Sequence, residues 1–599
     1  MSAAAPATAA TGASTAPSYQ PLTHRQILAI LAGLMLGMFL AALDQTIVAT
    51  AIRTIGDDLN GLSLQAWVTT AYLITSTIST PLYGKLSDQY GRKPFYLVAI
   101  GLFLVGSLLC GTAGSMYELA AYRAVQGLGG GGLMSLAITI LGDLLSPRER
   151  ARYQAYFLAV FGVSSVLGPI VGGFLAGADS ILGITGWRWI FLVNVPLGIA
   201  ALVVITKVLH LPPLRRVEHR IDWPGALALV VGLVPLLLVA EQGREWGWAS
   251  ALTLGALALG VLGLVGFVLA ERRAGDDALL PLRLFRNRTF ATGAAVNTVL
   301  GMGMFGAMVT LPLYLQIAKG MTPTAAGLAL LPLTLGIMTT SVIAGQTTSR
   351  TGVYKPFPVV GSALLTAGAL LMSRLVADSS LLEVSWRSAV FGLGLGLCMQ
   401  PLVLAVQNAV PPKDMGVATS SSLFFRQMGG TLGTAVFLSV LFSTVGERIE
   451  RRFAAAVTTP EFRAALEDPE VLADPATRPL LHLAEGGPVP SLDDSSFINA
   501  LDPRLAQPFV DGFADSTSTV LLVAAAILVV AFALTWLIPA LPLRQVSGIQ
   551  SRMDEEDAAA RADERAAAAT ATAVAAAEQG VGPEAVRAEA LDDDVPPRG

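Results

Sequence analysis

Residues 84–94 read Gly-Lys-Leu-Ser-Asp-Gln-Tyr-Gly-Arg-Lys-Pro, a short charged segment between two long apolar runs. It carries the charged side chains Lys85, Asp88, Arg92 and Lys93. When a membrane protein inserts, short loops rich in lysine and arginine stay on the cytoplasmic side. The segment therefore predicts a tight cytoplasmic turn that joins two membrane-spanning helices.

The composition of the whole chain agrees with a membrane location. Of the 599 residues, 53% are hydrophobic and 14% are charged, whereas soluble proteins carry about 25% charged residues. The basic residues lie in short loops and form no patch, which argues against nucleic-acid binding. Cys110 and Cys398 fall inside apolar runs, so we interpret them as small buried residues and predict neither a disulfide nor a metal site.

Fourteen apolar runs approach the roughly 20 residues that a helix needs to cross a bilayer. We therefore predict an all-α polytopic membrane protein. Loops that follow even-numbered runs carry most of the basic residues, which predicts a multi-pass protein of the cytoplasmic (inner) membrane with both termini in the cytoplasm. The predicted spans are 27–52, 66–83, 95–112, 118–141, 153–177, 188–208, 223–241, 250–270, 290–317, 325–346, 356–376, 386–410, 424–445 and 517–540.

An internal repeat indicates how these spans are organised. The segment 84–94 has a counterpart in residues 345–356, with glycines at the same spacing, although Ser349 and Val353 replace Asp88 and Arg92. Such a repeat predicts two six-helix bundles with two helices inserted between them. The predicted parts are a disordered cytoplasmic tail (1–25), the first bundle (26–209), the inserted pair (210–275), the second bundle (276–545) with an external segment (446–516), and an acidic, alanine-rich tail (546–599), which we expect to be disordered with at most transient helix.

Asp44 is the carboxylate that lies deepest in any apolar run. An acid in the membrane interior costs about 2.5–3.5 kcal/mol on insertion scales and is by default a functional residue. Because apolar surroundings favour the neutral carboxyl group, we predict that Asp44 takes up and releases a proton. Arg123 in the fourth span is its predicted partner, with a structural ion pair as the alternative for Asp44 and a guanidinium that reaches the outer surface as the alternative for Arg123.

Two glycine-rich segments predict close helix packing. Residues 123–132 contain Gln126 and four consecutive glycines, and residues 162–177 contain Pro169 among Gly168, Gly172 and Gly173. Small residues let neighbouring membrane helices approach closely, and a proline inside a helix removes one backbone hydrogen bond. We predict a kinked, closely packed fifth span.

With these motifs in order, the chain resembles the fourteen-helix drug:proton antiporters of the major facilitator superfamily (the EmrB/QacA type) over roughly residues 25–545. The matching motifs are residues 43–48, 84–94 and 123–132 and the glycine–proline motif at 168–173. The chain departs from the family pattern at Ala49 and Arg53, so the resemblance specifies the class of transported compound less closely than it specifies the fold.

The resemblance implies roles for particular residues. Asp44 and Arg123 would form the proton-coupling site. Asp88 would face the N-terminus of the eleventh span (356–376), and Arg92 would pair with Asp143 at the inner end of the fourth span. These contacts, together with Gly84 and Gly91, would form a conformational latch that holds the outward-facing state. Gly168, Pro169, Gly172 and Gly173 would be the antiporter motif.

Polar and flexible side chains inside the spans are candidates for a substrate cavity. Methionine and aromatic surface suits a promiscuous apolar pocket, although packing or lipid contact is the alternative for each residue. The candidates are Gln126, Asn297, Met304, Met308, Gln400 and Gln407.

These observations predict a proton-coupled antiporter that exports hydrophobic or amphipathic drugs or toxic compounds. No ATP-binding loop, nucleophile motif or histidine–cysteine cluster is present in the sequence, so we expect neither an enzyme nor a cofactor. The alternatives are export of an endogenous lipid, siderophore or secondary metabolite, and a non-transporting scaffold or sensor. The expected partners are the substrate, protons and lipid, with an envelope partner for segment 446–516, and we expect a functional monomer.

Overall fold

A computed structural model of the chain describes residues 23–59, 64–209, 221–468, 471 and 501–578. The chain divides into two compact units, of which Ile30–Gly548 is the larger and Met1–Ala29 with Ile549–Gly599 the smaller. The larger unit contains every site discussed below. Most of residues 1–25 and a large part of segment 446–516, including 472–500, lie outside the described residues.

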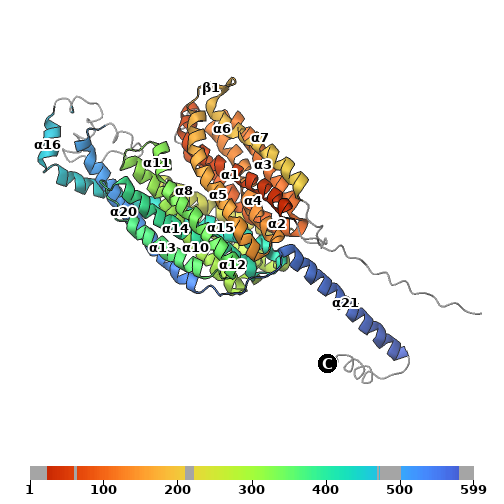
Figure 1. The fold of residues 1–599 in the computed structure, drawn as a ribbon. Coiled ribbons are helices and arrows are strands. Elements are labelled where there is room, and N and C mark those ends of the chain that lie inside the picture. The colour runs from red at the N-terminus through yellow and green to blue at the C-terminus, as the bar shows by residue number, and fades with distance from the viewer. Residues whose placement is uncertain (1–22, 60–63, 210–220, 469–470, 472–500, 579–599) are drawn as a thin grey trace, which may run out of the picture. The chain divides into compact units, whose positions relative to one another are not determined.

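The larger unit is built almost entirely from long helices (Figure 1). The first bundle comprises α1 (His24–Asp58), α2 (Gln65–Tyr90), α3 (Arg92–Thr112), α4 (Met116–Leu144), α5 (Pro147–Ala176), α6 (Trp189–Leu192) and α7 (Asn194–Val208). The inserted pair comprises α8 (Trp223–Trp246) and α9 (Ala251–Ala274). The second bundle comprises α10 (Arg288–Ile317), α11 (Pro323–Ala329), α12 (Leu331–Thr351), α13 (Pro356–Met372), α14 (Leu381–Ala409), α15 (Met415–Ala456) and α20 (Pro503–Trp536).

The helical membrane fold predicted from the sequence is confirmed. Among the described residues, twelve helical segments are long and apolar enough to cross a membrane, and α13 is a shorter apolar helix. The predicted span 66–83 corresponds to α2, and the predicted span 356–376 corresponds to α13. Each of the fourteen predicted spans therefore has a helical counterpart.

Two glycines end helices at corresponding places in the two bundles. Gly91 separates α2 from α3 with a φ of 100°, and Gly352 ends α12 with a φ of 74°. Side chains with a Cβ rarely adopt these backbone angles. The repeat seen in the sequence is therefore a repeat of backbone geometry, although Ser349 and Val353 replace Asp88 and Arg92 in the second copy.

The thirteenth predicted span, 424–445, is much shorter than the helix that contains it. α15 begins at Met415, and the hydroxyls of its first turns donate hydrogen bonds to carbonyls three or four residues earlier, as Thr419 does to Met415 and Ser422 to Ala418. Such bonds satisfy polar side chains within a buried helix. At its other end α15 runs on to Ala456 and packs with α16 (Pro460–Glu467) and the start of α20 through Phe453, Phe462 and Phe509.

The prediction of disorder from about residue 546 is wrong for much of the C-terminal tail. Residues Gly548–Glu578 form the helix α21. The sequence lacks an apolar stripe there, but it is rich in alanine, which has the highest helix propensity of all residues. Residues 579–599 lie outside the described residues.

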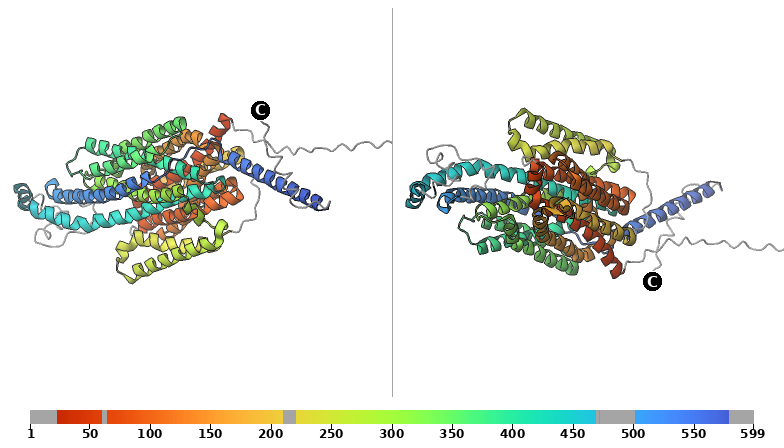
Figure 2. Two further views of the ribbon diagram at one scale, coloured as in Figure 1. Left: turned by 90° about the horizontal axis from the view of Figure 1, so that it is seen from below. Right: turned by 90° about the horizontal axis from the view of Figure 1, so that it is seen from above.

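Contacts between helices place the two bundles and the inserted pair. α2 packs on α4 in the first bundle, and α10 packs on α15 in the second. The bundles meet where α2 contacts α15 and where α5 contacts α12. Figure 2 shows α8 and α9 side by side at one edge, where α8 also contacts α2 and α15. The inserted helices therefore lie against both bundles without separating them.

Candidate functional site

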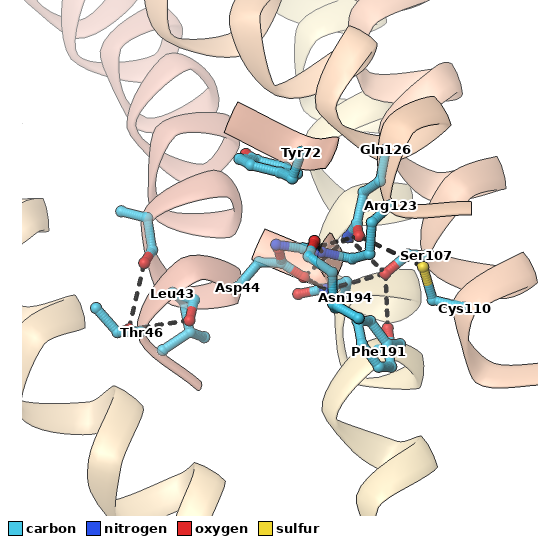
Figure 3. Close-up of polar contacts among 12 residues, drawn as sticks. Leu43, Asp44, Thr46, Tyr72, Ser107, Cys110, Arg123, Gln126, Phe191 and Asn194 are labelled. Atoms are coloured by element: carbon cyan, nitrogen blue, oxygen red, sulfur yellow. Dashed lines mark hydrogen bonds and ion pairs between the residues drawn. The ribbon is translucent and has the colours of Figure 1, made fainter. Parts of the chain in front are cut away.

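Asp44 lies in the middle of α1 and is fully buried. Its Oδ2 accepts a hydrogen bond of 2.5 Å from Nη1 of Arg123 in α4, and the arginine is 1% exposed (Figure 3). The predicted pair is therefore present as a buried ion pair. Charge-assisted hydrogen bonds of this kind are shorter and stronger than neutral ones.

Two amide side chains complete the coordination of Asp44. Gln126 of α4 and Asn194 of α7 each donate a hydrogen bond of 2.8 Å to its Oδ1. Both amides also donate to the hydroxyl of Ser107 in α3, which in turn donates to the carbonyl of Phe191. We call Asp44, Ser107, Arg123, Gln126 and Asn194 the Asp44 cluster. Its members come from four helices, so the first bundle must be assembled before the cluster exists.

Arg123 is held by more than its ion pair. Its guanidinium carbon lies 4.3 Å from the centre of the Tyr72 ring and 6.0 Å from that of Phe191. Its Nη1 donates to Oε1 of Gln126 at 2.7 Å, and its Nε donates to the carbonyl of Val68 at 3.4 Å. These contacts hold the guanidinium inside the bundle, so the alternative that it reaches the outer surface is wrong.

Ser107, Asn194 and Tyr72 were not predicted as site residues from the sequence. Ser107 and Asn194 are polar residues inside apolar runs, and this pattern was visible in the sequence. The same signal marks many hydroxyl residues that merely bond to their own helix, as Ser135 and Thr139 do. Only the packing of α3 and α7 beside α4 selects Ser107 and Asn194 as neighbours of Asp44.

The glycine–proline motif of α5 lies against α1 beside this cluster. A Cβ at Gly168 would collide with the side chain of Thr46, and one at Gly172 would collide with that of Thr50. Thr46 also donates a hydrogen bond of 3.1 Å to the carbonyl of Ser164. A Cβ at Gly173 would meet nothing within 4 Å. The predicted close packing thus uses two of the three glycines.

α5 continues as one helix through Pro169. A Cβ at Gly327 of α11 would lie 3.5 Å from the Pro169 ring, so this proline faces the second bundle. The predicted kink of the fifth span stays a prediction.

A second polar cluster, formed by Asp88, Arg92 and Asp143, joins the two bundles. Nε of Arg92 donates to Oδ2 of Asp143 at 2.6 Å, and Arg92 also forms an ion pair with Asp88. Asp88 accepts hydrogen bonds from the backbone amides of Gly416 (3.1 Å) and Val417 (2.8 Å) in the first turn of α15. We call these three residues the Asp88 cluster.

The expected partner of Asp88 was the eleventh predicted span (356–376), and this is wrong. Asp88 binds the N-terminus of α15, which contains the thirteenth predicted span. Free backbone amides and the helix dipole favour an anion at that position. The predicted physical interaction, an anion at a helix N-terminus, is therefore present at another helix. Gly84 adjoins this contact, where a Cβ would collide with Ser420.

Further contacts between the bundles lie at the same end. Arg150 of α5 donates to Oε1 of Gln407 in α14, whose Nε2 donates to Thr419 of α15 at 2.7 Å. Nζ of Lys85 donates to the carbonyl of Asp276, which lies in the segment between α9 and α10.

The same segment also reaches the start of α15. Arg283 donates two hydrogen bonds of 2.8 Å to the carboxylate of Asp414 and one of 2.7 Å to Asp276. The hydrogen bonds to Asp414 raise the pKa of Arg283, so it stays charged. The segment that follows the inserted pair thus connects α2 to α15.

The six candidate cavity residues lie in different environments. Gln126 belongs to the Asp44 cluster, Gln407 bonds to Arg150 and Thr419, and Met304 packs in the core of the second bundle. Asn297 donates to the carbonyl of Gly293 in its own helix. Met308 is 46% exposed. The contacts of Gln126, Gln407, Met304 and Asn297 are thus with the protein itself, and a role in a substrate cavity stays a prediction for all six residues.

The side chain of Arg53 lies outside the described part of the chain. The two lysines of the charged turn have specific partners: Lys85 donates to the carbonyl of Asp276, and Lys93 donates to the carbonyl of Thr206 at 2.8 Å.

Comparison with known proteins adds a family context to this geometry. Residues 34–434 match the family model described as the Major Facilitator Superfamily. The chain is 38% identical to the multidrug transporter protein MdtP of Bacillus subtilis over 418 residues, which cover 70% of this chain and 76% of that protein. It is 37% identical to a tetracycline resistance determinant of Streptomyces rimosus, over 57% of this chain and 97% of that protein.

Among solved structures, the proton:xylose symporter XylE superposes with a TM-score of 0.54 at 15% identity, covering 88% of this chain and 99% of that one. At this identity the likeness concerns the fold alone.

Proposed function

Because this chain belongs to the major facilitator superfamily, a family of membrane transporters rather than enzymes, we propose that it is a proton-coupled antiporter that exports hydrophobic or amphipathic compounds. The observation that carries the proposal is the Asp44 cluster: a fully buried carboxylate paired with a buried arginine inside a membrane bundle. The relatives named for multidrug transport and tetracycline resistance support export as the direction.

The contacts of Asp44 suit a group that changes its protonation state. As a carboxylate it accepts from Arg123, Gln126 and Asn194. When a proton neutralises it, the attraction to Arg123 weakens and the new O–H needs an acceptor. Oδ1 of Asn194 is buried and has no hydrogen-bond donor among the described residues, so rotation of this amide offers that acceptor. The cluster can thus satisfy the hydrogen bonds of Asp44 both as a carboxylate and as a neutral carboxyl group.

α4 connects this protonation step to the contact between the bundles. It carries Arg123 and Gln126 near one end and Asp143 near the other, seventeen residues beyond Gln126, which corresponds to about 26 Å along a helix. A shift of Arg123 after protonation would move α4 relative to α1, and Asp143 would move with it. We propose that this releases the Asp88 cluster from α15 and allows the bundles to rock.

We further propose a cytoplasmic-membrane location with both termini inside. The basic residues of the short loops support this orientation. It places the Asp88 cluster on the cytoplasmic side and the Asp44 cluster toward the outside.

Reconstituted protein provides the test. Full-length wild type and Asp44→Asn would be compared in proteoliposomes for accumulation of a fluorescent amphipathic dye under an imposed pH gradient, and for dye exchange without a gradient. We expect the variant to lose gradient-driven accumulation and to keep exchange. Asp58→Asn is the matched control, because this exposed carboxylate at the end of α1 binds Trp187 and not Arg123. Undiminished accumulation by Asp44→Asn would overturn the assignment of the proton site.

A further inference from the structure

Arg426 is a cation in the first third of α15 whose guanidinium has no protein partner among the described residues. It is half-buried, and no carboxylate of the described chain forms an ion pair with it. It lies nine residues beyond Val417, so it is about 14 Å along the helix from the Asp88 cluster. A charged side chain at this depth of a membrane protein is by default a functional residue.

The orientation of Arg426 follows from its neighbours on α15. Thr419 faces α14, since it accepts a hydrogen bond from Gln407. Arg426 comes seven residues later, two helical turns on and at nearly the same angle. Its backbone carbonyl also lies against Gly301 of α10, where a Cβ would collide with it. The side chain therefore projects toward α10 and α14 in the interior of the bundle and not toward lipid.

Gln400 occupies the position on α14 that corresponds to that of Arg426 on α15. The two helices run antiparallel, and Gln400 lies seven residues before Gln407, just as Arg426 lies seven residues after Thr419. Oε1 of Gln400 is buried and has no hydrogen-bond donor among the described residues. The two side chains therefore flank one region, and neither has its polar atoms satisfied by the other.

The charge balance of the second bundle leaves this cation uncompensated. α10, α12 and α13 contain no aspartate or glutamate. The carboxylates of α14 and α15 are Glu383 in the first turn of α14, and Glu447 and Glu450 far along α15. Those of α20 are Asp511 and Asp515 near its start, and Asp515 pairs with Arg452 at the far end of α15. In the first bundle the charge of Asp44 is neutralised by Arg123. The interior near Arg426 is thus net positive.

We propose that Arg426 and Gln400 bind an acidic group of the transported compound, so that the transporter selects amphipathic anions such as carboxylates. This inference rests on the proposed function and specifies its substrate class. A guanidinium binds a carboxylate through parallel hydrogen bonds. Oε1 of Gln400 accepts from a hydroxyl or amide of the ligand next to that acid. A permanently cationic compound would be repelled.

Equilibrium binding tests this site independently of transport. Purified full-length protein in lipid nanodiscs would be titrated with pyrenebutyrate, its uncharged methyl ester and a pyrenebutyl trimethylammonium cation, using pyrene fluorescence. Wild type is expected to bind the carboxylate at least about tenfold more tightly than the ester, as for other charge-assisted contacts. Arg426→Gln should remove this difference while leaving the affinity for the ester unchanged, and Arg426→Lys should keep part of it.

Arg448→Gln is the control, because this arginine of the same helix donates to Thr519 and should not affect the preference. Equal loss of carboxylate and ester binding in Arg426→Gln would assign Arg426 a structural role and overturn the proposal. No change in that variant would overturn it too. If wild type prefers the carboxylate in the binding experiment but does not accumulate dye under the pH gradient, the proposed function fails and the anion site stands.

Discussion

Asp88 of α2 accepts a hydrogen bond of 2.8 Å from the backbone amide of Val417 in α15, 329 residues later in the chain. This bond crosses from the first bundle to the second. It uses the free amides at a helix N-terminus, which the helix dipole makes favourable for an anion. This one carboxylate is therefore expected to stabilise the contact between the bundles at this end.

The first prediction concerns that carboxylate. Asp88→Asn removes the charge that α15 binds and the ion pair with Arg92, so the two bundles should separate more often at this end. Hydrogen bonds to charged groups contribute about 1.5–3 kcal/mol, which corresponds to roughly a tenfold or greater change in population. Spin labels at the exposed positions Tyr90 and Val353 would report the change as a longer distance in double electron–electron resonance.

Glu447→Gln is the control for this measurement. Its carboxylate is 68% exposed and pairs with Arg451 one turn away. The distance distribution should stay that of wild type, since exposed pairs contribute little. An unchanged distribution in Asp88→Asn would show that other contacts, such as Arg150 with Gln407, hold the bundles together.

The second prediction is a thermodynamic cycle on the buried pair. Arg123→Gln leaves the Asp44 carboxylate without its counter-charge, and Asp44→Asn does the same to Arg123. Removing one partner of a buried pair costs about 3–5 kcal/mol, whereas replacing both costs less. In detergent, the double variant Asp44→Asn/Arg123→Gln should therefore unfold at a higher temperature than Arg123→Gln alone. Additive losses from the two single changes would contradict the ion pair.

The third prediction compares two adjacent glycines of α5. A methyl group at Gly172 would collide with Thr50 of α1, whereas one at Gly173 would meet open space. Gly172→Ala should lower stability by about 1–3 kcal/mol, as overpacking does. Gly173→Ala should leave stability unchanged or raise it slightly through helix propensity. Both are read as shifts in unfolding temperature, and equal shifts would mean that α5 does not pack on α1 through this face.

The fourth prediction concerns the segment between the inserted pair and the second bundle. Arg283→Gln removes the paired hydrogen bonds to Asp414 and the bond to Asp276. Because this segment also binds Lys85, the variant should lengthen the same Tyr90–Val353 distance, though less than Asp88→Asn does. Arg273→Gln, on the exposed end of α9, is the comparison. A larger increase of this distance in Arg283→Gln than in Asp88→Asn would show that this segment is the main contact that holds the two bundles together at this end.

Some expectations from the sequence were confirmed and others were wrong, for reasons that lie in particular residues. Asp44 and Arg123 were recognisable because a charge in an apolar run is costly, and a buried cation in another span is the natural partner. The α15 partner of Asp88 was misassigned because it depends on which helix of the second bundle packs on α2. The extent of α15 was underestimated because its first turns contain Thr419, Ser420, Ser421 and Ser422, which lower hydropathy without disfavouring a buried helix.

By itself, the sequence determined that this protein is a bundle of membrane-crossing helices with one deeply buried acid, since apolar run length and the cost of burying charge are properties of the chain. Only the tertiary structure decided which polar groups surround that acid, that Asp88 reaches α15, and that Arg426 has no counter-ion in the part of the chain that the structure describes. Those facts depend on which faces of distant helices meet, and hydrogen bonds and charge balance act over a few ångströms in space regardless of distance along the chain.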